Sequence, residues 1–256
     1  MKKLIIGTLL VISCGTFLFA QNYKDGFYFA QDNDFTNNQK NQVVIQVNGG
    51  KITSANWNIL SLVAGMQDLK SIAASGSVAN AVTWAGQAKA TENYLVSSQN
   101  VNTTSVPNGP ANVKPFFDLA KKALGSKAVA KGSYTKDGWF FAQDPNIDDY
   151  HTENYVLITI VNGTMVDVLW NGVLEGLHPS INPSKLITAR ANNYPMTGAK
   201  KPWQVQSATA SAALIKAQDP NAIKIKDNGE PDGISGVTIQ ISKFLDMSKL
   251  ALQSAK

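Results

Sequence analysis

The sequence predicts an α+β protein made of two tandem copies of one small domain, each with an antiparallel sheet followed by helices. Two observations predict this fold class. The segment Lys-Asp-Gly-Phe-Tyr-Phe-Ala-Gln-Asp at 24–32 recurs at 136–144 with seven of its nine positions identical. In each copy, segments with the alternating pattern of strands come first and segments with helical spacing follow, which is typical of α+β rather than doubly wound folds.

The repeat continues beyond this segment after a slip of one residue. Residues 43–58 align with 156–171, and residues 116–124 align with 244–252. A period above 100 residues is too long for a solenoid repeat, so it indicates two copies of a domain. We expect one copy over residues 22–130 and the other over residues 131–256.

The composition is that of a globular protein. The chain has 256 residues, of which 44% are hydrophobic and 16% are charged, and these values exclude a disordered chain, a coiled coil and a collagen-like fibre. Of the 23 basic residues, Lys2 and Lys3 fall in the leader, which leaves 21 against 18 acidic residues. Arg190 is the only arginine, and the lysines are spread along the chain. Nucleic-acid readers favour clustered arginine, so we expect no nucleic-acid partner.

Residues 1–20 have the pattern of an export signal, with two lysines before an apolar run at 4–20. Cleavage after Ala20 would release a soluble protein. Residues 11–14 also resemble a lipobox, which would leave a lipidated Cys14 at the N-terminus and anchor the protein as a lipoprotein. An uncleaved anchor is a third alternative. In each case we expect an exported protein, periplasmic or at the cell surface, and Cys14 is the only cysteine.

Strands open each copy, at 26–31 and 138–143. Val43, Ile45 and Val47 alternate with more polar residues, which is strand periodicity. Residues 48–50 and 162–163 contain the asparagine and glycine residues that tolerate positive φ in hairpin turns. We expect the return strands to end at Trp57 and Trp170 and these two side chains to lie in the core.

Helices follow the strands. Alanine-rich segments predict helices around 78–99 and 204–218, and an amphipathic helix closes each copy. In the second copy, the residues expected on the buried side of that closing helix are Ile241, Phe244, Leu245, Ser248 and Leu252.

The segment just before the last helix, residues 232–238, carries the clearest functional signal. Its sequence is Asp232-Gly233-Ile234-Ser235-Gly236-Val237-Thr238. Two glycines and a serine predict a tight turn, and we expect the helix to begin at about Thr238. Free amides at such a helix start can bind a phosphate, and a threonine hydroxyl there can contact one or be joined to one. The alternative is structural, with Ser235 or Thr238 as the helix N-cap.

The chain resembles the FMN-binding domain family, in tandem, and within it the exported "major membrane immunogen" group. Relatives include flavin-carrying subunits of sodium-pumping and electron-bifurcating membrane oxidoreductases. The resemblance rests on the Tyr-x-x-Gly opening of residues 23–26 (loosely 134–138), the hairpin at 47–52, and Lys185 with residues 194–196 ahead of Trp203. It rests most on residues 232–238, which match the family's Asp-x-x-Ser/Thr-Gly-Ala-Thr.

The resemblance implies a cofactor and its attachment point. Asp232 matches the acid of the motif, Ser235 and Gly236 its turn, and Thr238 the residue that accepts FMN through a phosphoester bond. Gly233 and Val237 fall inside the same cofactor-binding segment. An exported flavin transferase that uses magnesium would install the FMN. Tyr194, Met196 and Trp203 would either line the flavin or belong to the core.

Two departures from the family pattern bear on this expectation. Val237 stands where the family has alanine, and a β-branched side chain there is bulkier and stiffer. Covalent FMN, non-covalent FMN and no FMN therefore all stay open. The first copy has residues 104–110 before its closing helix, with neither the acid nor the acceptor threonine. If one copy binds flavin, it is the second.

The implied function is electron transfer by an exported FMN-binding carrier rather than catalysis, with a membrane-bound electron donor or acceptor as partner. The alternative is a flavin-free surface or periplasmic module that keeps the fold for interaction or antigen display. A flavin-dependent reductase is a third, weaker reading. We identify no catalytic residues and no metal ligands, because His151 and His178 are the only histidines and lack metal-site spacing.

Overall fold

The computed structural model describes residues 23–63, 65, 67–175, 183–196 and 201–256. The predicted leader, with Cys14 and both cleavage sites, and His178 lie outside the described residues. The first unit contains, in order, β1 (Gly26–Gln31), β2 (Gln39–Asn48), β3 (Lys51–Ser61), α1 (Leu69–Ala74), α2 (Ala79–Ser98) and α3 (Lys114–Leu124). The second contains β4 (Gly138–Gln143), β5 (Thr152–Val161), β6 (Thr164–Leu174), α4 (Lys185–Arg190), α5 (Trp203–Ala217), the short 3-10 helix η1 (Pro220–Ala222) and α6 (Ser242–Gln253).

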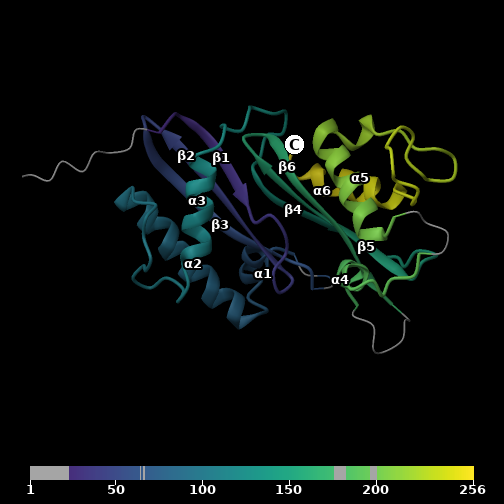
Figure 1. Ribbon diagram of the computed structural model, residues 1–256, viewed down its shortest axis with the longest axis horizontal. Helices are drawn as coiled ribbons and strands as arrows, with labels where there is room; N and C mark the ends of the chain where they lie inside the picture. The colour runs from purple at the N-terminus through teal and green to yellow at the C-terminus, as the bar shows by residue number, and fades with distance from the viewer. Residues whose placement is uncertain (1–22, 64, 66, 176–182, 197–200) are drawn as a thin grey trace, which may run out of the picture.

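The predicted α+β class is confirmed, with two similar units. Each sheet has three antiparallel strands in sequence order, β1-β2-β3 and β4-β5-β6. Helices α2 and α3 pack on the first sheet, and α5 and α6 pack on the second. The two sheets lie next to each other in the middle of the molecule, so the layers run helix, sheet, sheet, helix (Figure 1).

The repeated Lys-Asp-Gly segment holds the hairpin of each sheet. The Asp25 carboxylate accepts hydrogen bonds from the amides of Gly49 and Gly50, and the Asp137 carboxylate does the same for residues 162 and 163. The glycine after each aspartate has a φ near +145°, which a side chain rarely permits (Gly26 +148°, Gly138 +144°). The repeated residues are thus fold determinants at these positions.

A repeated glutamine ties each long helix to its hairpin. Gln99 and Gln218 end α2 and α5 in the left-handed conformation. The Gln99 side chain accepts from the Ile52 amide and donates to the Ile52 carbonyl, and Gln218 makes the same pair of bonds with Met165. The shared sequence therefore reflects a shared docking of helix on strand.

The predicted core residues are confirmed, while the strand ends differ. Trp57 and Trp170 are buried, and each indole N–H donates to an asparagine oxygen on the neighbouring strand. The return strands do not end at these tryptophans as predicted. They run on to Ser61 and Leu174, because four more residues pair with the start of β2 and β5.

A buried carboxylate joins the two sheets. Asp167 on β6 accepts hydrogen bonds from Lys40 Nζ at 2.9 Å, Gln42 Nε2 at 2.8 Å and Gln31 Nε2 at 3.1 Å. All three donors come from the first unit, and both members of the Asp167–Lys40 ion pair are buried. The two copies are therefore packed into one body. Across the described ranges, no helix is both long enough and apolar enough to cross a membrane.

Candidate functional site

The closing loop, residues 232–238, lies on the surface of the second unit between η1 and α6. It begins where the Asp232 amide donates to the Lys224 carbonyl at 2.8 Å. Gly233 and Gly236 have φ values of +86° and +80°, in the left-handed region that favours glycine. The two glycines therefore supply the turn that the sequence predicted.

The last helix does not begin at Thr238, and that prediction is wrong. Helix α6 begins at Ser242, with Ile241 in the N-cap position and no side-chain capping bond. The Ile241 amide donates to the Gly229 carbonyl at 2.8 Å, which holds the preceding segment against another loop instead of in a helical turn. Neither Ser235 nor Thr238 is the N-cap, and the first-turn amides of α6 do not start in the closing loop.

Val237 and Thr238 point to opposite environments. Val237 is only 5% exposed and belongs to the core of the second unit, whereas Thr238 is exposed. The extra bulk of valine, relative to the alanine of the motif that the sequence resembles, is thus taken up by the core. The valine side chain therefore adds no bulk at the surface around the Thr238 hydroxyl.

A buried glutamine on α5 holds Thr238 in place. Gln206 Oε1 accepts the Thr238 amide at 2.7 Å and the Thr238 hydroxyl at 3.3 Å, and Gln206 Nε2 donates to the Lys201 carbonyl at 2.7 Å. Gln206 is fully buried, so its amide has no water to exchange for these partners. Among the described residues no donor is hydrogen-bonded to the Thr238 hydroxyl oxygen, which stays available on the surface.

A lysine ammonium lies against the same turn. A Cβ added to Gly236 would lie 2.6 Å from Lys201 Nζ, so the glycine leaves the room that this side chain occupies. Lys201 and Gln206 flank the start of α5. The closing loop is thus joined to the N-terminal end of α5, and a positive charge sits two residues from Thr238.

Next to this end of α5 is a buried lysine between aromatic rings. Lys185 Nζ is 5.0 Å from the ring centroids of both Tyr194 and Trp203, and 3.3 Å from Thr152 Oγ1. Lys185 is 4% exposed. Within the described residues no carboxylate reaches ion-pair distance of it. Its positive charge is balanced by ring faces and one hydroxyl.

Burial shifts the pKa of two groups in this cluster. Desolvation lowers the pKa of Lys185 from its ordinary value of 10.5 to about 8, and the charge of Asp148 partly opposes this. Desolvation also raises the pKa of Tyr194 to about 12, with a further contribution from the charge of Asp148. At neutral pH the cluster therefore holds a lysine that releases its proton more easily than usual and a neutral tyrosine.

The first copy lacks this lysine. Asn58 and Asn171 are equivalent, because each side-chain oxygen accepts the next amide of its strand and the second amide of the following short helix. By the same pattern Lys185 corresponds to Leu69. At the start of the short helix the first copy thus has an apolar residue and the second copy a charged one.

The remaining predicted site residues fall into two groups. Asp232, Gly233 and Ser235 are exposed in the closing loop, whereas Met196 is half-buried and packs against the core of the second unit, as does Tyr194. The structure therefore brings Tyr194 beside Trp203, with ring centroids 6.3 Å apart, and places Met196 in a packing role.

Two hollows are prominent among the described residues, and neither is lined by the closing loop. One, of about 680 Å³, lies in the first unit, and the other, of about 290 Å³, lies between the units.

Sequence reasoning missed Gln206 and Lys201 as site residues. Gln206 aligns with Gln87 in the repeat, which was a signal that the position matters. Nothing in the sequence placed it under Thr238, since the two are 32 residues apart. Lys201 carries no such signal.

The described part of the chain holds no group of three or more His, Cys, Asp or Glu side chains placed to bind a metal ion. His151 is exposed, in a turn with φ of +54°.

Comparison with known proteins gives no matching family model and no matching curated protein. One solved structure is similar. A solution NMR structure of a protein from Clostridium thermocellum is 35% identical to this chain, covering 48% of it and 93% of that protein's own chain, with a TM-score of 0.38.

Proposed function

We propose that this chain is an exported FMN-binding electron carrier, with the FMN phosphate at Thr238 of the second copy. The observation that carries the proposal is the exposed Thr238 hydroxyl, whose position is fixed by the buried Gln206 side chain. A hydroxyl that is both accessible and held in one place suits attachment of a phosphate, because little conformational freedom is lost on modification.

The charges around the loop fit the phosphate end of FMN. A phosphodiester carries a negative charge, and Lys201 Nζ lies against the turn at Gly236. A cation at this place offsets the charge that attachment brings to the loop. As the Oγ1–P bond forms, Thr238 loses its hydroxyl hydrogen and the phosphorus loses its P–O bond to a leaving group, which is a nucleoside monophosphate when the donor is a flavin dinucleotide. The chain then gains the mass of FMN less one water.

The cluster of Lys185, Tyr194 and Trp203 fits the ring end of FMN. FMN, when bound, takes up and releases one or two electrons. Lys185, poorly solvated and without a carboxylate partner, is a cation that would favour added negative charge nearby, and Tyr194 offers a half-buried ring face for stacking. The partners we propose are an exported flavin transferase and a membrane-bound electron donor or acceptor.

Flavin retained after denaturation tests this function. We expect the wild-type protein, co-expressed with a flavin transferase and magnesium, to keep flavin absorbance through acid precipitation, with about one flavin per chain. Thr238→Ala should keep none, because the attachment oxygen is gone. Thr209→Ala is the matched control, since it removes a threonine hydroxyl from the solvent side of α5, outside the closing loop, and should leave the flavin content unchanged.

Wild-type protein that emerges colourless would overturn the proposal. It would favour the second function, a flavin-free interaction or antigen module. One observation supports that second function: the buried Val237 packs in the core of the second unit, so this position of the motif serves the fold. Flavin that is bound but lost on denaturation would mean non-covalent binding and would contradict attachment at Thr238.

A further inference from the structure

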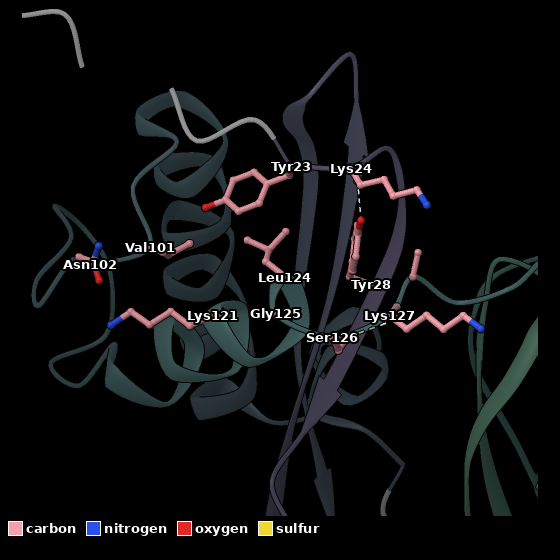
Figure 2. Close-up of a pocket in the computed structure, with 11 residues that line it drawn as sticks. Tyr23, Lys24, Tyr28, Val101, Asn102, Lys121, Leu124, Gly125, Ser126 and Lys127 are labelled. Carbon is pink, nitrogen blue, oxygen red and sulfur yellow. Dashed lines mark hydrogen bonds between the residues drawn. The ribbon is translucent and has the colours of Figure 1, made fainter. Parts of the chain in front are cut away.

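The first unit contains a hollow of about 680 Å³ beside the point where the described chain begins. Figure 2 shows Tyr23, Leu124 and Tyr28 across its middle. Lys24 and Lys127 extend to one side, and Lys121 extends to the opposite side, next to Asn102 (Figure 2). The residues that line the hollow are Tyr23, Lys24, Tyr28, Val101, Asn102, Lys121, Leu124, Gly125, Ser126, Lys127 and Ala128. Three of them are lysines and none is acidic, so the hollow combines an apolar floor with a positive rim.

The second unit closes the equivalent space with its own chain. Ser126 and Ser254 are equivalent, since each hydroxyl donates to a carbonyl three residues earlier in its closing helix. One residue further on, Ala255 is fully buried, and its carbonyl accepts the amides of residues 135 and 136. In the first unit Lys127 stands at that place and is exposed, because the chain turns away there into the linker. The hollow is therefore not required by the fold.

The lysines around the hollow continue into a larger positive surface. We define the lysine face as Lys24, Lys51, Lys127 and Lys131, which are all exposed. The segments that carry them are held together. The Tyr23 amide donates to the Gly50 carbonyl, and the Val129 amide donates to the Phe27 carbonyl at 2.7 Å. Figure 1 shows the hairpin between β2 and β3 and the linker at the same end of the molecule.

On the lysine face, positive charges outnumber negative charges. Among the described residues, none of its four lysines has a carboxylate within ion-pair distance. The carboxylates of Asp25 and Asp137 lie at this end and keep their negative charge while they accept hydrogen bonds from the hairpin amides, so the four lysines exceed these two carboxylates by two charges. The surface therefore keeps a positive potential that attracts anions.

The position of the lysine face in the chain favours an anionic membrane surface as its partner. Only two residues separate Tyr23 from the apolar run at 4–20, which the sequence predicts to be an export leader. Two or three extended residues span at most about 10 Å. While that run is in a bilayer, Tyr23 and the hollow it lines are held close to the lipid headgroups, where lysine side chains are attracted to an anionic surface.

We propose that the lysine face binds an anionic phospholipid surface and that the hollow accepts a lipid headgroup. The phosphate fits the lysine rim, and the glycerol and upper acyl carbons fit the floor of Tyr23 and Leu124. This function does not depend on flavin. It orients the molecule with its N-terminal end and linker toward the membrane.

Vesicle binding tests the lysine face. The mature chain from Gln21, which keeps every described helix and strand, is mixed with vesicles of phosphatidylglycerol and phosphatidylcholine and sedimented. We expect binding that weakens as salt rises. Changing Lys24, Lys51, Lys127 and Lys131 to glutamine should weaken it at least tenfold. A control set with the same loss of charge on other surfaces, Lys89, Lys216, Lys224 and Lys249 to glutamine, should weaken it far less.

Three outcomes would overturn the proposal: no binding by the wild-type chain, equal binding to pure phosphatidylcholine, or equal losses in the two variant sets. If the wild-type chain does not bind vesicles but binds an acidic protein through these lysines, the lysine face is a protein interface and the lipid proposal fails. All eight lysines are exposed, so both variants should keep the wild-type circular dichroism spectrum.

Amide chemical shifts test the hollow itself. Titration with monomeric short-chain phosphatidylglycerol should move the amide signals of Lys24, Gly125, Ser126 and Lys127. The equivalent signals of the second unit, such as Lys136 and Ser254, should stay in place, because Ala255 is fully buried there and its carbonyl is bonded to the amides of residues 135 and 136. Shifts of equal size in the two units, or none in the first, would contradict a headgroup site in the hollow.

Discussion

At the scale of single residues, the two copies differ at the start of their short helices, where only the second copy has a buried charge. Lys185 is 4% exposed and faces two aromatic rings, whereas its counterpart Leu69 is an ordinary apolar residue. A buried charge without a carboxylate partner costs stability, so its presence calls for a reason other than folding. The proposed electron carrier supplies one, since the charge contacts Trp203 at the N-terminal end of α5, the end that also holds the closing loop through Gln206.

The cost of this charge can be measured through the pH dependence of stability. Because the pKa of Lys185 is lowered from 10.5 to about 8, the unfolded chain binds more protons than the folded chain between these values. The contribution of Lys185 to the free energy of unfolding should therefore rise with pH from about 8 to 10.5. Below pH 8 both states hold the proton and the full cost remains.

Lys185→Met should raise the free energy of unfolding at pH 7 by about 1–3 kcal/mol, because it removes the buried charge and keeps the volume. It should also remove the rise above pH 8. Urea unfolding at pH 7 and pH 9.5 measures both effects, with the exposed Lys216→Met as control. A variant less stable than wild type at pH 7 would contradict this account of Lys185.

At the scale of elements, the sequence predicted most strands and helices but not where the last helix begins. The strand at 26–31, the helix around 78–99 and the buried side of the closing helix are as predicted, because local periodicity determines them. The start of α6 depends on a bond from Ile241 to Gly229, which no local pattern reveals. The sequence did not predict the short helices α1 and α4, because a helix of six residues is too short to show a clear periodic pattern.

Helix α6 is fixed to the end of β4 by an ion pair. Lys243 Nζ lies 2.7 Å from the Asp144 carboxylate, and this bond is the main cause that lowers the pKa of Asp144 below 3.8. A carboxyl group with a lowered pKa stabilises the fold above its ordinary pKa, and this stabilisation is lost as the pH falls through the lowered value.

Asp144→Asn should therefore destabilise the protein by about 1 kcal/mol at pH 7, a modest effect because the Lys243 side chain is about half exposed. The difference from wild type should shrink once the pH falls below 3.8. Thermal unfolding across this pH range measures it. Asp118→Asn, which breaks an exposed pair with Lys114 on α3, should cost less than about 0.5 kcal/mol. Equal losses for the two variants would contradict the anchoring role.

At the scale of the whole molecule, the central feature is the contact between the two sheets. Asp167 gathers three side chains of the first unit in this contact. The repeat could not predict it. Asp167 pairs with Thr159 across the strands as Ser54 pairs with Gln46, so the acid stands where the first copy has a small neutral residue. The acid at the centre of this contact is thus at a position where the copies differ.

Asp167→Leu should lower the free energy of unfolding by about 3–5 kcal/mol, because it leaves Lys40 buried without a partner. Adding Lys40→Met should restore a large part of the loss by removing the unpaired charge. Urea unfolding followed by tryptophan fluorescence compares the three proteins. A double variant no more stable than Asp167→Leu alone would mean that the ion pair does not hold the units together.

The closing loop was predicted only in part. The positions of its glycines and of Thr238 followed from the sequence, whereas the support from Gln206 and the inward direction of Val237 needed the fold. These two features are what make Thr238 an exposed and fixed hydroxyl.

The most direct test of the proposed function is therefore the intact mass of the exported protein from cells that contain a flavin transferase. The account predicts one added mass equal to FMN less one water, located on the peptide that contains Thr238. An unmodified mass, or the added group on another residue, would contradict it.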